Sequence, residues 1–329
     1  MKRKIIPAIL IASIVFGSCS SGDSTIESGG TIKLLAYDAF TPEPEIFTSF
    51  TKETGIDVIV SLGGDTGTLV SKALLTAGTP EADVLWGVDN TLISRAIDGK
   101  LFESYKEVDT AAVCVNYDKD YFAKNDIAPP VTLMDLALPI YKDMLVIQNP
   151  VTSSPGLAFM LATISKFGVN DWEQYWKSLR ANGVKIVDDW TSAYTVEFSG
   201  SSGKGKYPLV VSYGSSPPAE VVYSDPPVTE PPTAVMEQTC FGQIEYAGIL
   251  RGTKKTKNAQ KLIDFLTGKI FQESMPLTLF VVPINPDAVL PEVFSKFAVI
   301  PQNPLTLDAA DISSNRVAWL DTWTNIMLR

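Results

Sequence analysis

The stretch VDDWTSAY, residues 187–194, places two large aromatic side chains beside two acids. Trp190 and Tyr194 are four residues apart, and Asp188 and Asp189 come directly before them. Four residues is about one turn of a helix, and rings at that spacing most often belong to a hydrophobic core. The alternative is the wall of a binding site for a solute that attracts both aromatic surface and negative charge, as a cation does.

Residues that could perform catalysis are scarce in this chain. Its 329 residues include no histidine, which is the commonest general base and the commonest ligand of transition metals. A Ser-His-Asp or Cys-His site is therefore impossible. Because the sequence also has no metal-ligand cluster and no nucleophile motif, we expect no enzyme, no metal site and no cofactor. An extracellular hydrolase or transferase is a remote alternative.

The chain is acidic, with a formal net charge of −10. A nucleic-acid partner would need a basic face, so we expect none. An acidic protein tolerates a cationic ligand well, although net charge mainly reflects solubility.

The first 18 residues have the pattern of an export signal. A basic start, MKRK, is followed by an apolar run over residues 5–16, which is shorter than the ~20 residues needed to span a bilayer. FGSC resembles a bacterial lipobox, although Phe16 stands where leucine is usual. We expect residues 1–18 to be removed, Cys19 to be lipidated and residues 19–30 to form a flexible tether. The protein would then lie at the extracellular face of the membrane or in the periplasm; an ordinary signal with an incidental cysteine is the alternative.

The remaining chain predicts strands that alternate with helices. We expect strands at 32–36, 56–62 and 82–90 and helices at 44–55 and 65–78. Such an α/β pattern predicts a parallel sheet, and ligands collect at the carboxyl ends of its strands. The three loops expected at those ends each carry an aspartate: Asp38, Asp65 and Asp89.

A second α/β section follows. The helix expected at 170–183 has a stripe of Trp172, Tyr175 and Trp176, which we assign to the core. Residues 216–232 are rich in proline, and we expect an irregular loop there. The other expected elements are strands at 112–122, 144–150, 207–215 and 241–250, and helices at 152–168, 257–274 and 313–327, the last packing Val317, Leu320 and Trp323 inward.

Several motifs now occur in a characteristic order after the anchored signal: YDAF, ADVLWGVDN, VNYDK, NPVTSSPG, DDWTSAY and VSYGSSPPAE. Together they resemble the thiamine-binding family of extracellular solute-binding proteins that serve ABC importers, over residues 31–329. The resemblance implies an α/β, two-lobed periplasmic-binding-protein-like fold of type II with a ligand cleft between the lobes. Lobe 1 would comprise 31–112 plus 240–329, and lobe 2 would comprise 113–239. The protein would be a monomer that captures thiamine or a thiamine phosphate and delivers it to a membrane permease.

The resemblance also implies roles for single residues. Tyr37 would stack on the ligand, Asp65 would lie near its charged ring, and Ser153 would make a polar contact at a helix start, where backbone N–H groups could hold an anionic tail. Trp190 would be a stacking wall, and Tyr194 either part of it or core. The expected ligand-binding set is Tyr37, Asp38, Asp65, Asp89, Ser153, Ser154, Trp190, Tyr194, Tyr213 and Phe280.

The sequence departs from the family pattern in three places. Phe280 stands where relatives can have tryptophan, Ala219 where a relative can have tyrosine, and the segment over 105–113 is short, with Thr110 where an aromatic residue is common. A trimmed loop and an altered ligand preference both fit these departures. Iron(III) and polyamines are alternative ligands, because the wider class that shares this fold includes proteins that bind them.

Family strand order places Cys114 and Cys240 close together where the chain crosses between lobes. Outside the cytoplasm they could form a disulfide, or each could be a small buried hydrophobic residue.

Overall fold

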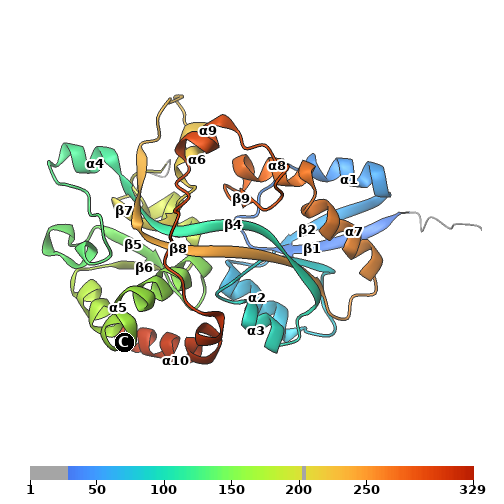
Figure 1. Ribbon diagram of the computed structural model, residues 1–329, viewed down its shortest axis with the longest axis horizontal. Coiled ribbons are helices and arrows are strands. Elements are labelled where there is room, and N and C mark those ends of the chain that lie inside the picture. Colours follow the sequence, from blue (N-terminus) through green and yellow to red (C-terminus); the bar gives the residue numbers. More distant parts are fainter. Residues whose placement is uncertain (1–28, 202–204) are drawn as a thin grey trace, which may run out of the picture.

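The computed structural model describes residues 29–201 and 205–329. The expected signal sequence, Cys19 and nearly all of the tether lie outside the described residues. The described chain forms two α/β lobes side by side, joined by two long strands that run from one lobe to the other (Figure 1). Within the described ranges, no helix combines the length and the apolar character needed to cross a membrane.

The elements alternate along the chain largely as the sequence predicts. The strands are β1 (Gly30–Ala36), β2 (Ile56–Leu62), β3 (Val84–Asp89), β4 (Phe102–Asp118), β5 (Leu145–Gln148), β6 (Lys185–Val187), β7 (Leu209–Tyr213), β8 (Thr233–Leu250) and β9 (Val282–Pro283). The α-helices are α1 (Ile46–Thr54), α2 (Thr66–Leu75), α3 (Ile93–Asp98), α4 (Lys119–Lys124), α5 (Ser154–Ala181), α6 (Pro217–Val222), α7 (Thr256–Leu266), α8 (Lys269–Thr278), α9 (Glu292–Phe297) and α10 (Ala309–Met327).

A single sheet runs through both lobes. Its order is β2-β1-β3-β8-β4-β7-β5-β6, and β9 pairs with β4. The pairs β1–β2, β1–β3, β5–β6 and β5–β7 are parallel, as the α/β alternation predicts. The strands β4 and β8 are antiparallel to each other and to their neighbours β7 and β3. Each lobe is therefore a small parallel sheet, and β4 and β8 connect the two.

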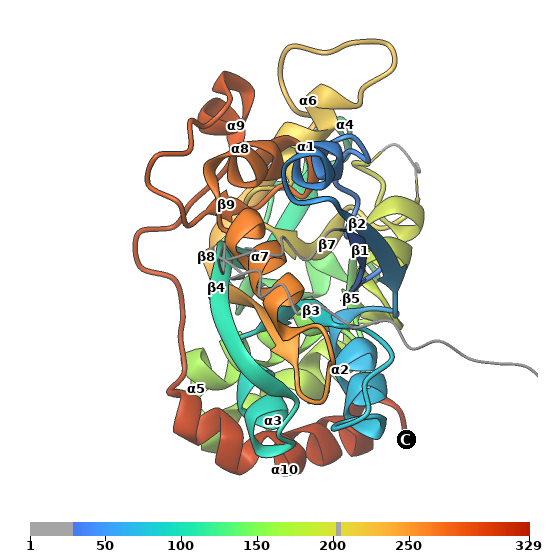
Figure 2. The same cartoon turned by 90° about the vertical axis from the view of Figure 1, so that its right-hand side faces the viewer.

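Helices cover both faces of the sheet in lobe 1, which contains β1, β2 and β3 (Figure 2). One face buries side chains of α1, α7 and α8 against Ile32, Leu34 and Trp86. The other face buries α2 and α3 against Leu85 and Val88. Leu85 thus faces the opposite layer from Trp86, and a shift in register between Trp86 and Val88 turns Val88 to the same layer as Leu85; all six residues of the strand are buried.

The two crossing strands are longer than the sequence predicts. β4 has 17 residues and β8 has 18, where we expected short strands at 112–122 and 241–250. Irregularities in the register near Glu107 and near Val113 interrupt the regular ladder, and bulges of this kind bend a strand without ending it. Where the strands cross, Cys114 and Cys240 form a disulfide with a Cα–Cα separation of 4.1 Å. The structure therefore contains the disulfide, rather than two unbonded buried cysteines.

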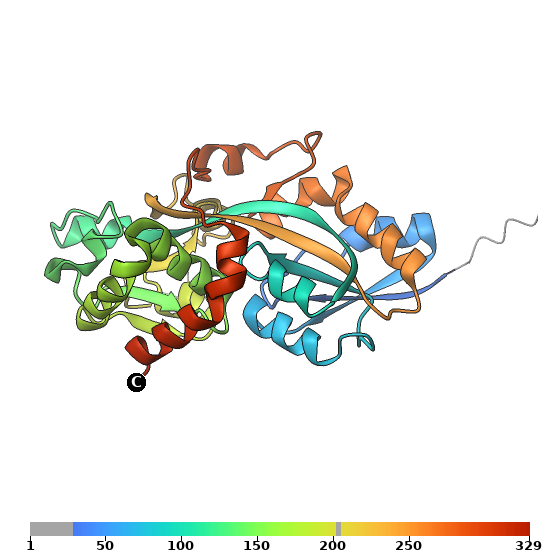
Figure 3. The same cartoon turned by 60° about the horizontal axis from the view of Figure 1, so that its bottom comes forward.

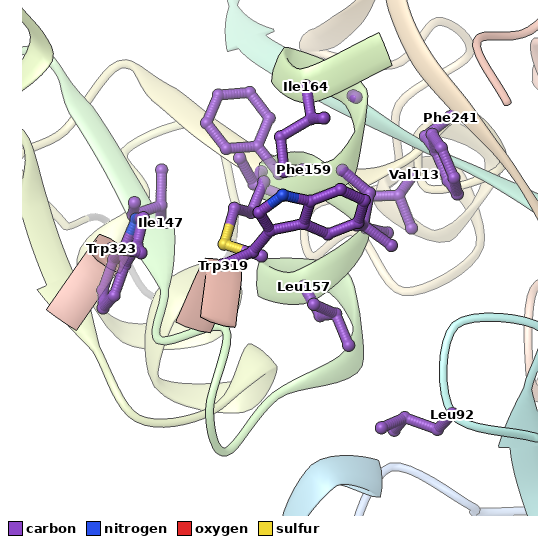
Figure 4. Packing of buried hydrophobic residues seen from close by; sticks show 14 of the residues in the cluster. Leu92, Val113, Ile147, Leu157, Phe159, Ile164, Phe241, Trp319 and Trp323 are labelled. Atoms are coloured by element: carbon purple, nitrogen blue, oxygen red, sulfur yellow. The ribbon is translucent and has the colours of Figure 1, made fainter. Parts of the chain in front are cut away.

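Lobe 2 contains β5, β6, β7, α4 and α5, and its core confirms the expected aromatic stripe. Trp172, Tyr175 and Trp176 are all buried on α5. The two helices expected at 152–168 and 170–183 are continuous in α5 except at Gly168, whose φ of 74° interrupts the helix. Figure 4 shows part of the buried cluster that includes this core, with Phe159 on α5 and Trp319 and Trp323 on α10.

The C-terminal helix contacts lobe 2. The rings of Trp323 and Trp176 are 5.6 Å apart and nearly perpendicular, so α10 packs against α5 (Figure 3). We expected residues 240–329 to belong to lobe 1, and α10 departs from that division because its buried tryptophans complete the core of the other lobe. We propose that the remaining boundaries, near residues 112 and 240, fall within the crossing strands.

Three local expectations were wrong. Part of the proline-rich segment is helical, because Pro217 and Pro218 occupy the first turn of α6, where a missing N–H costs nothing. The helix expected at 257–274 is two helices, since Gly268 has extended backbone angles between α7 and α8. On α10, Val317 is 63% exposed, and Trp319 is buried instead.

Candidate functional site

Three carboxyl groups lie side by side on neighbouring strands near the crossing. Glu245 of β8 is paired with Asp89 of β3 on one side and with Asp109 of β4 on the other. Residues paired directly across a sheet share one face and have closely spaced side chains. All three are almost completely buried, at 0% exposure for Asp89 and Asp109 and 4% for Glu245. We call these three residues the acid row.

The acid row has no cationic partner among the residues that the structure describes. None of the five ion pairs formed within the described ranges includes one of its members. Neither carboxyl oxygen of Asp109 has a hydrogen-bond partner. Burial raises the pKa of Asp109 to about 8, and burial together with the negative charges of Asp109 and Asp89 raises the pKa of Glu245 well above its ordinary value. The row is therefore a place where positive charge would be strongly favoured.

Two tyrosines stand beside the acid row. The hydroxyl of Tyr37, just after β1, donates to Glu245 Oε2 at 3.2 Å. The ring of Tyr37 lies over Gly87, where a β-carbon would come within 2.2 Å of it, so only glycine leaves room. Burial raises the pKa of Tyr213, at the end of β7, and nearby Glu245, Asp65, Asp89 and Asp109 raise it further.

Asp65 links the two lobes. It begins α2 in lobe 1, and its carboxylate accepts hydrogen bonds from Ser153 Oγ at 2.8 Å and from the backbone N–H of Ser154 at 3.1 Å, both at the start of α5 in lobe 2. It also accepts from the backbone N–H of Trp190 at 3.1 Å and from that of Thr66 at 2.6 Å. Although these bonds favour the carboxylate, burial outweighs them and raises the pKa of Asp65 to about 6.

A second polar contact between the lobes joins Ser154 of lobe 2 to Asp89 of lobe 1. Ser154 Oγ donates to Asp89, and Gln243 Nε2 donates to Asp89 Oδ2 at 2.9 Å. The backbone of the lobes also approaches closely, because Thr68 N–H donates to the carbonyl of Thr152 at 3.0 Å. A β-carbon at Gly67 would come within 2.7 Å of that carbonyl oxygen, so a glycine is needed here. The lobes are in contact, as in a closed binding protein.

The aromatic pair of the stretch 187–194 lies on the lobe 2 side of these contacts. Trp190 and Tyr194 are stacked, with ring centroids 5.0 Å apart and an interplanar angle of 11°. The indole Nε1–H of Trp190 donates to Ser212 Oγ at 2.9 Å, which fixes the ring's orientation. Tyr213 lies 6.4 Å from Trp190 at a tilt of 54°. Trp190 is thus held between a buried tyrosine and the tyrosine beside the acid row.

Comparison with known proteins identifies the family. Residues 103–305 match the family model described as bacterial extracellular solute-binding protein. The chain belongs to this family. It is 26% identical over 316 residues to the thiamine-binding periplasmic protein of Salmonella typhimurium, covering 91% of this chain and 94% of that protein. It is 25% identical over 347 residues to the protein of the same name in Escherichia coli, covering both chains completely.

The fold of this solute-binding protein agrees with that of a solved periplasmic thiamin binding protein. The two superpose with a TM-score of 0.80 at 23% identity, covering 92% of this chain and 97% of the other. The expected two-lobed type II fold is thereby confirmed. In this chain, Asp65 of lobe 1 contacts Trp190 of lobe 2, and Trp190 contacts Tyr213.

The expected ligand-binding residues do not all lie together in this solute-binding protein. Tyr37, Asp65, Asp89, Ser153, Ser154, Trp190 and Tyr213 are linked by the contacts above. Asp38 is exposed, and its carboxylate accepts from the backbone N–H of Gly64 at 2.8 Å, so it ties a loop. Tyr194 is only 4% exposed and lies behind Trp190 in a hydrophobic cluster. For both residues, ligand contact remains a prediction.

Phe280 lies in the segment between α8 and β9. Its ring packs edge-to-face on Tyr223 at 5.8 Å, and its carbonyl accepts a hydrogen bond from Ser215 Oγ. Ser215 follows Tyr213 by two residues, so the backbone of Phe280 lies near that end of the site. Its direct contact with a ligand also remains a prediction.

Two residues of the acid row, Asp109 and Glu245, were missed by the sequence analysis. The sequence does contain a signal for Glu245. In an alternating strand pattern Glu245 lies on the same face as the apolar residues Ala247 and Ile249, and Ile244 and Tyr246 lie on the other face. A lone carboxylate on an otherwise buried face indicates function. Asp109 lies in a part of β4 that the sequence did not predict as a strand, so its pairing with Glu245 could not be foreseen. Among the residues that the structure describes, no His, Cys, Asp and Glu group is arranged to hold a metal ion.

Proposed function

We propose that this protein captures thiamine outside the cytoplasmic membrane, as a monomer, and delivers it to the permease of an ABC importer without changing it chemically. The observation that carries the proposal is the acid row, which forms no ion pair among the described residues and accepts a hydrogen bond from Tyr37. The names of the similar proteins support the same ligand.

Thiamine has the properties that this site favours. It combines a flat pyrimidine with a permanently cationic thiazolium, and a cation over an aromatic face gains ~0.5–2 kcal/mol, more where water is excluded. Carboxylates in a dry site add a Coulomb attraction that water would weaken. We propose that Trp190 and Tyr213 provide the aromatic surface, and that Asp109 and Glu245 provide the countercharge.

We propose further that unphosphorylated thiamine binds better than its phosphate esters. The sequence suggested that backbone N–H groups at the start of α5 could hold an anionic tail. The N–H of Ser154 instead donates to the carboxylate of Asp65, and Pro155 has no N–H to offer. A phosphate at this position would have to displace a carboxylate and would be repelled by the acid row.

A polyamine is the second candidate, because its ammonium groups would also be attracted to the acid row. The rings of Trp190 and Tyr213 favour thiamine, since a flat aromatic cation stacks over a larger area than an alkylammonium chain does.

Titration calorimetry of the purified protein with thiamine, thiamine monophosphate and spermidine tests the proposal, together with native mass spectrometry for a co-purified ligand. We expect thiamine to bind most tightly and the mass of thiamine to be carried by a fraction of the protein. Tighter binding of spermidine than of thiamine would replace this proposal with the polyamine one.

We also propose that Cys19 is lipidated and anchors the protein to the membrane. The order of basic, apolar and small residues before this cysteine supports it. A Cys19→Ala form should leave the membrane fraction on cell fractionation. If it stays membrane-bound to the same extent as the wild type, the anchor is elsewhere.

A further inference from the structure

The acid row poses an electrostatic problem when the site is empty. Like charges directly opposite one another in a sheet destabilise it, and Glu245 has a carboxyl group opposite it on both sides. Of the three acids, Asp89 is supplied with donors from Thr91, Ser154 and Gln243. Glu245 receives one hydrogen bond, from Tyr37, and Asp109 receives none.

The three acids of the row therefore differ in how many hydrogen bonds stabilise their charge. A buried carboxylate without donors is so unfavourable that the group takes up a proton instead. Asp109 and Glu245 lack such a set of donors and cannot both remain charged. Two adjacent carboxyls in this condition share a proton, and the shared proton belongs to the pair.

We propose that Asp109 and Glu245 are the residues that select a cationic solute, and that they hold a proton in the ligand-free protein which the positive charge of the solute displaces. On binding, the O–H bond of the carboxylic acid breaks, the proton passes to water, and the carboxylate pairs with the solute. The identity of the solute rests on the proposed function, but the proton on the pair does not.

The groups that surround the pair all favour this exchange. Asp89 on β3 and Asp65 at the start of α2 add negative charge, and Tyr37 and Tyr213 add hydroxyls whose pKa values burial raises, so they remain neutral. The residue paired with Asp109 on β9 is Pro283, which carries no charge. Within the described ranges no lysine or arginine forms an ion pair with any of these acids. The raised pKa values of Asp109 and Glu245 agree with a proton held near neutral pH.

Infrared spectroscopy of the ligand-free protein at pH 7 tests for the proton without any ligand. Protonated carboxylic acids have a C=O absorption distinct from that of carboxylates. We expect this band in the wild type and in Asp57→Asn, which removes an exposed acid of β2. The Asp109→Asn and Glu245→Gln double variant should lack it. Absence of the band from the wild type, or its persistence in the double variant, would overturn the inference.

Titration calorimetry with thiamine tests the displacement. Binding at pH 7 in two buffers with different ionisation enthalpies should reveal about one proton released by the wild type and by Asp57→Asn. The association constant should rise about tenfold per pH unit between pH 5 and 7. Asp109→Asn should bind thiamine at least tenfold more weakly than the wild type and release fewer protons. Glu245→Gln should show the same two changes.

The two proposals fail in different ways. Thiamine binding without proton release, and with no loss of affinity in Asp109→Asn, would overturn the inference and leave the thiamine proposal intact. If thiamine does not bind but spermidine binds with proton release, the thiamine proposal is wrong and the selection of a cation by Asp109 and Glu245 stands.

Discussion

The carboxylate of Asp65 accepts a hydrogen bond from the backbone N–H of Trp190, which lies 125 residues further along the chain and in the other lobe. The same carboxylate accepts from Ser153 and Ser154, so one side chain of lobe 1 holds two segments of lobe 2. The expected role of Asp65 was to face the charged ring of the ligand. Its oxygens accept hydrogen bonds from protein donors in this structure, and we propose that Asp65 is a latch that forms when the lobes close; its place near the charged ring stays a prediction.

The latch predicts the effect of Asp65→Asn. The amide would present N–H donors to the donors of Ser153, Ser154 or Trp190, and a buried polar group without its partner costs about 1–3 kcal/mol. We expect thiamine affinity to fall by about tenfold or more, with the ligand-free form shifted towards separated lobes in small-angle X-ray scattering. Because these are short, water-excluded bonds, the loss should change little with salt. A loss that is large only at low salt would indicate a direct charge contact with the ligand instead.

Two tryptophans provide a matched pair of substitutions. Trp190 is only partly buried and lies between Tyr194 and Tyr213, whereas Trp176 is completely buried between Phe159 and Trp323. Trp190→Ala should weaken thiamine binding by roughly 1–3 kcal/mol through lost stacking and cation–π attraction. Trp176→Ala should reduce the free energy of unfolding by about 3–5 kcal/mol and leave the affinity of the folded fraction nearly unchanged.

Calorimetry and thermal melts of both variants give the two quantities. Tyr194→Phe is a useful companion, because the buried Tyr194 hydroxyl has no hydrogen-bond partner; its removal should leave the affinity nearly unchanged and should not lower the free energy of unfolding. If Trp190→Ala melts early and binds normally, Trp190 belongs to the core and the stretch 187–194 has only a structural role.

Local sequence patterns predicted the residues of the candidate site that lie at strand ends. Asp65 and Asp89 were predicted because a loop follows each predicted strand, and the family resemblance added to the case for Asp65. Trp190 was predicted from its acidic neighbours together with that resemblance. Asp109 and Glu245 depend on the register of two long strands separated by more than a hundred residues. Register is fixed by the packing of the whole sheet and by bulges, and neither has a local signal in this chain. The contact of α10 with lobe 2 is likewise set by tertiary packing of Trp323 on Trp176.

The disulfide between Cys114 and Cys240 predicts a loss of stability on its removal. It closes a loop of 126 residues, and a cross-link over a loop of that size restricts the unfolded chain by up to about 5 kcal/mol. We expect the Cys114→Ser and Cys240→Ser double variant to unfold at lower denaturant concentration. Because neither cysteine belongs to the acid row or the aromatic pair, the folded fraction should bind thiamine as the wild type does. Unchanged stability would mean that the unfolded chain is compact without the bond.

The acid row predicts how stability depends on pH. The pKa of Asp109 rises from 3.8 to about 8 on folding, so between about pH 4 and 8 the folded protein holds a proton that the unfolded chain releases. The free energy of unfolding then falls as the pH rises through this window, by up to ~1.4 kcal/mol per pH unit for each such proton. Asp65, whose pKa rises to about 6, and Glu245 act in the same direction.

Thermal melts of the ligand-free protein from pH 4.5 to 8.5 measure this dependence. The melting temperature should be higher at pH 5 than at pH 8, and Asp109→Asn should flatten the decline and be more stable than the wild type at pH 8. Asp57→Asn, which removes an exposed acid, should parallel the wild type. Thiamine should raise the melting temperature more at pH 8 than at pH 5, because at the higher pH less of its binding energy goes into removing the proton. Melting temperatures of wild type and Asp109→Asn that change in parallel with pH would show that Asp109 does not titrate in this range.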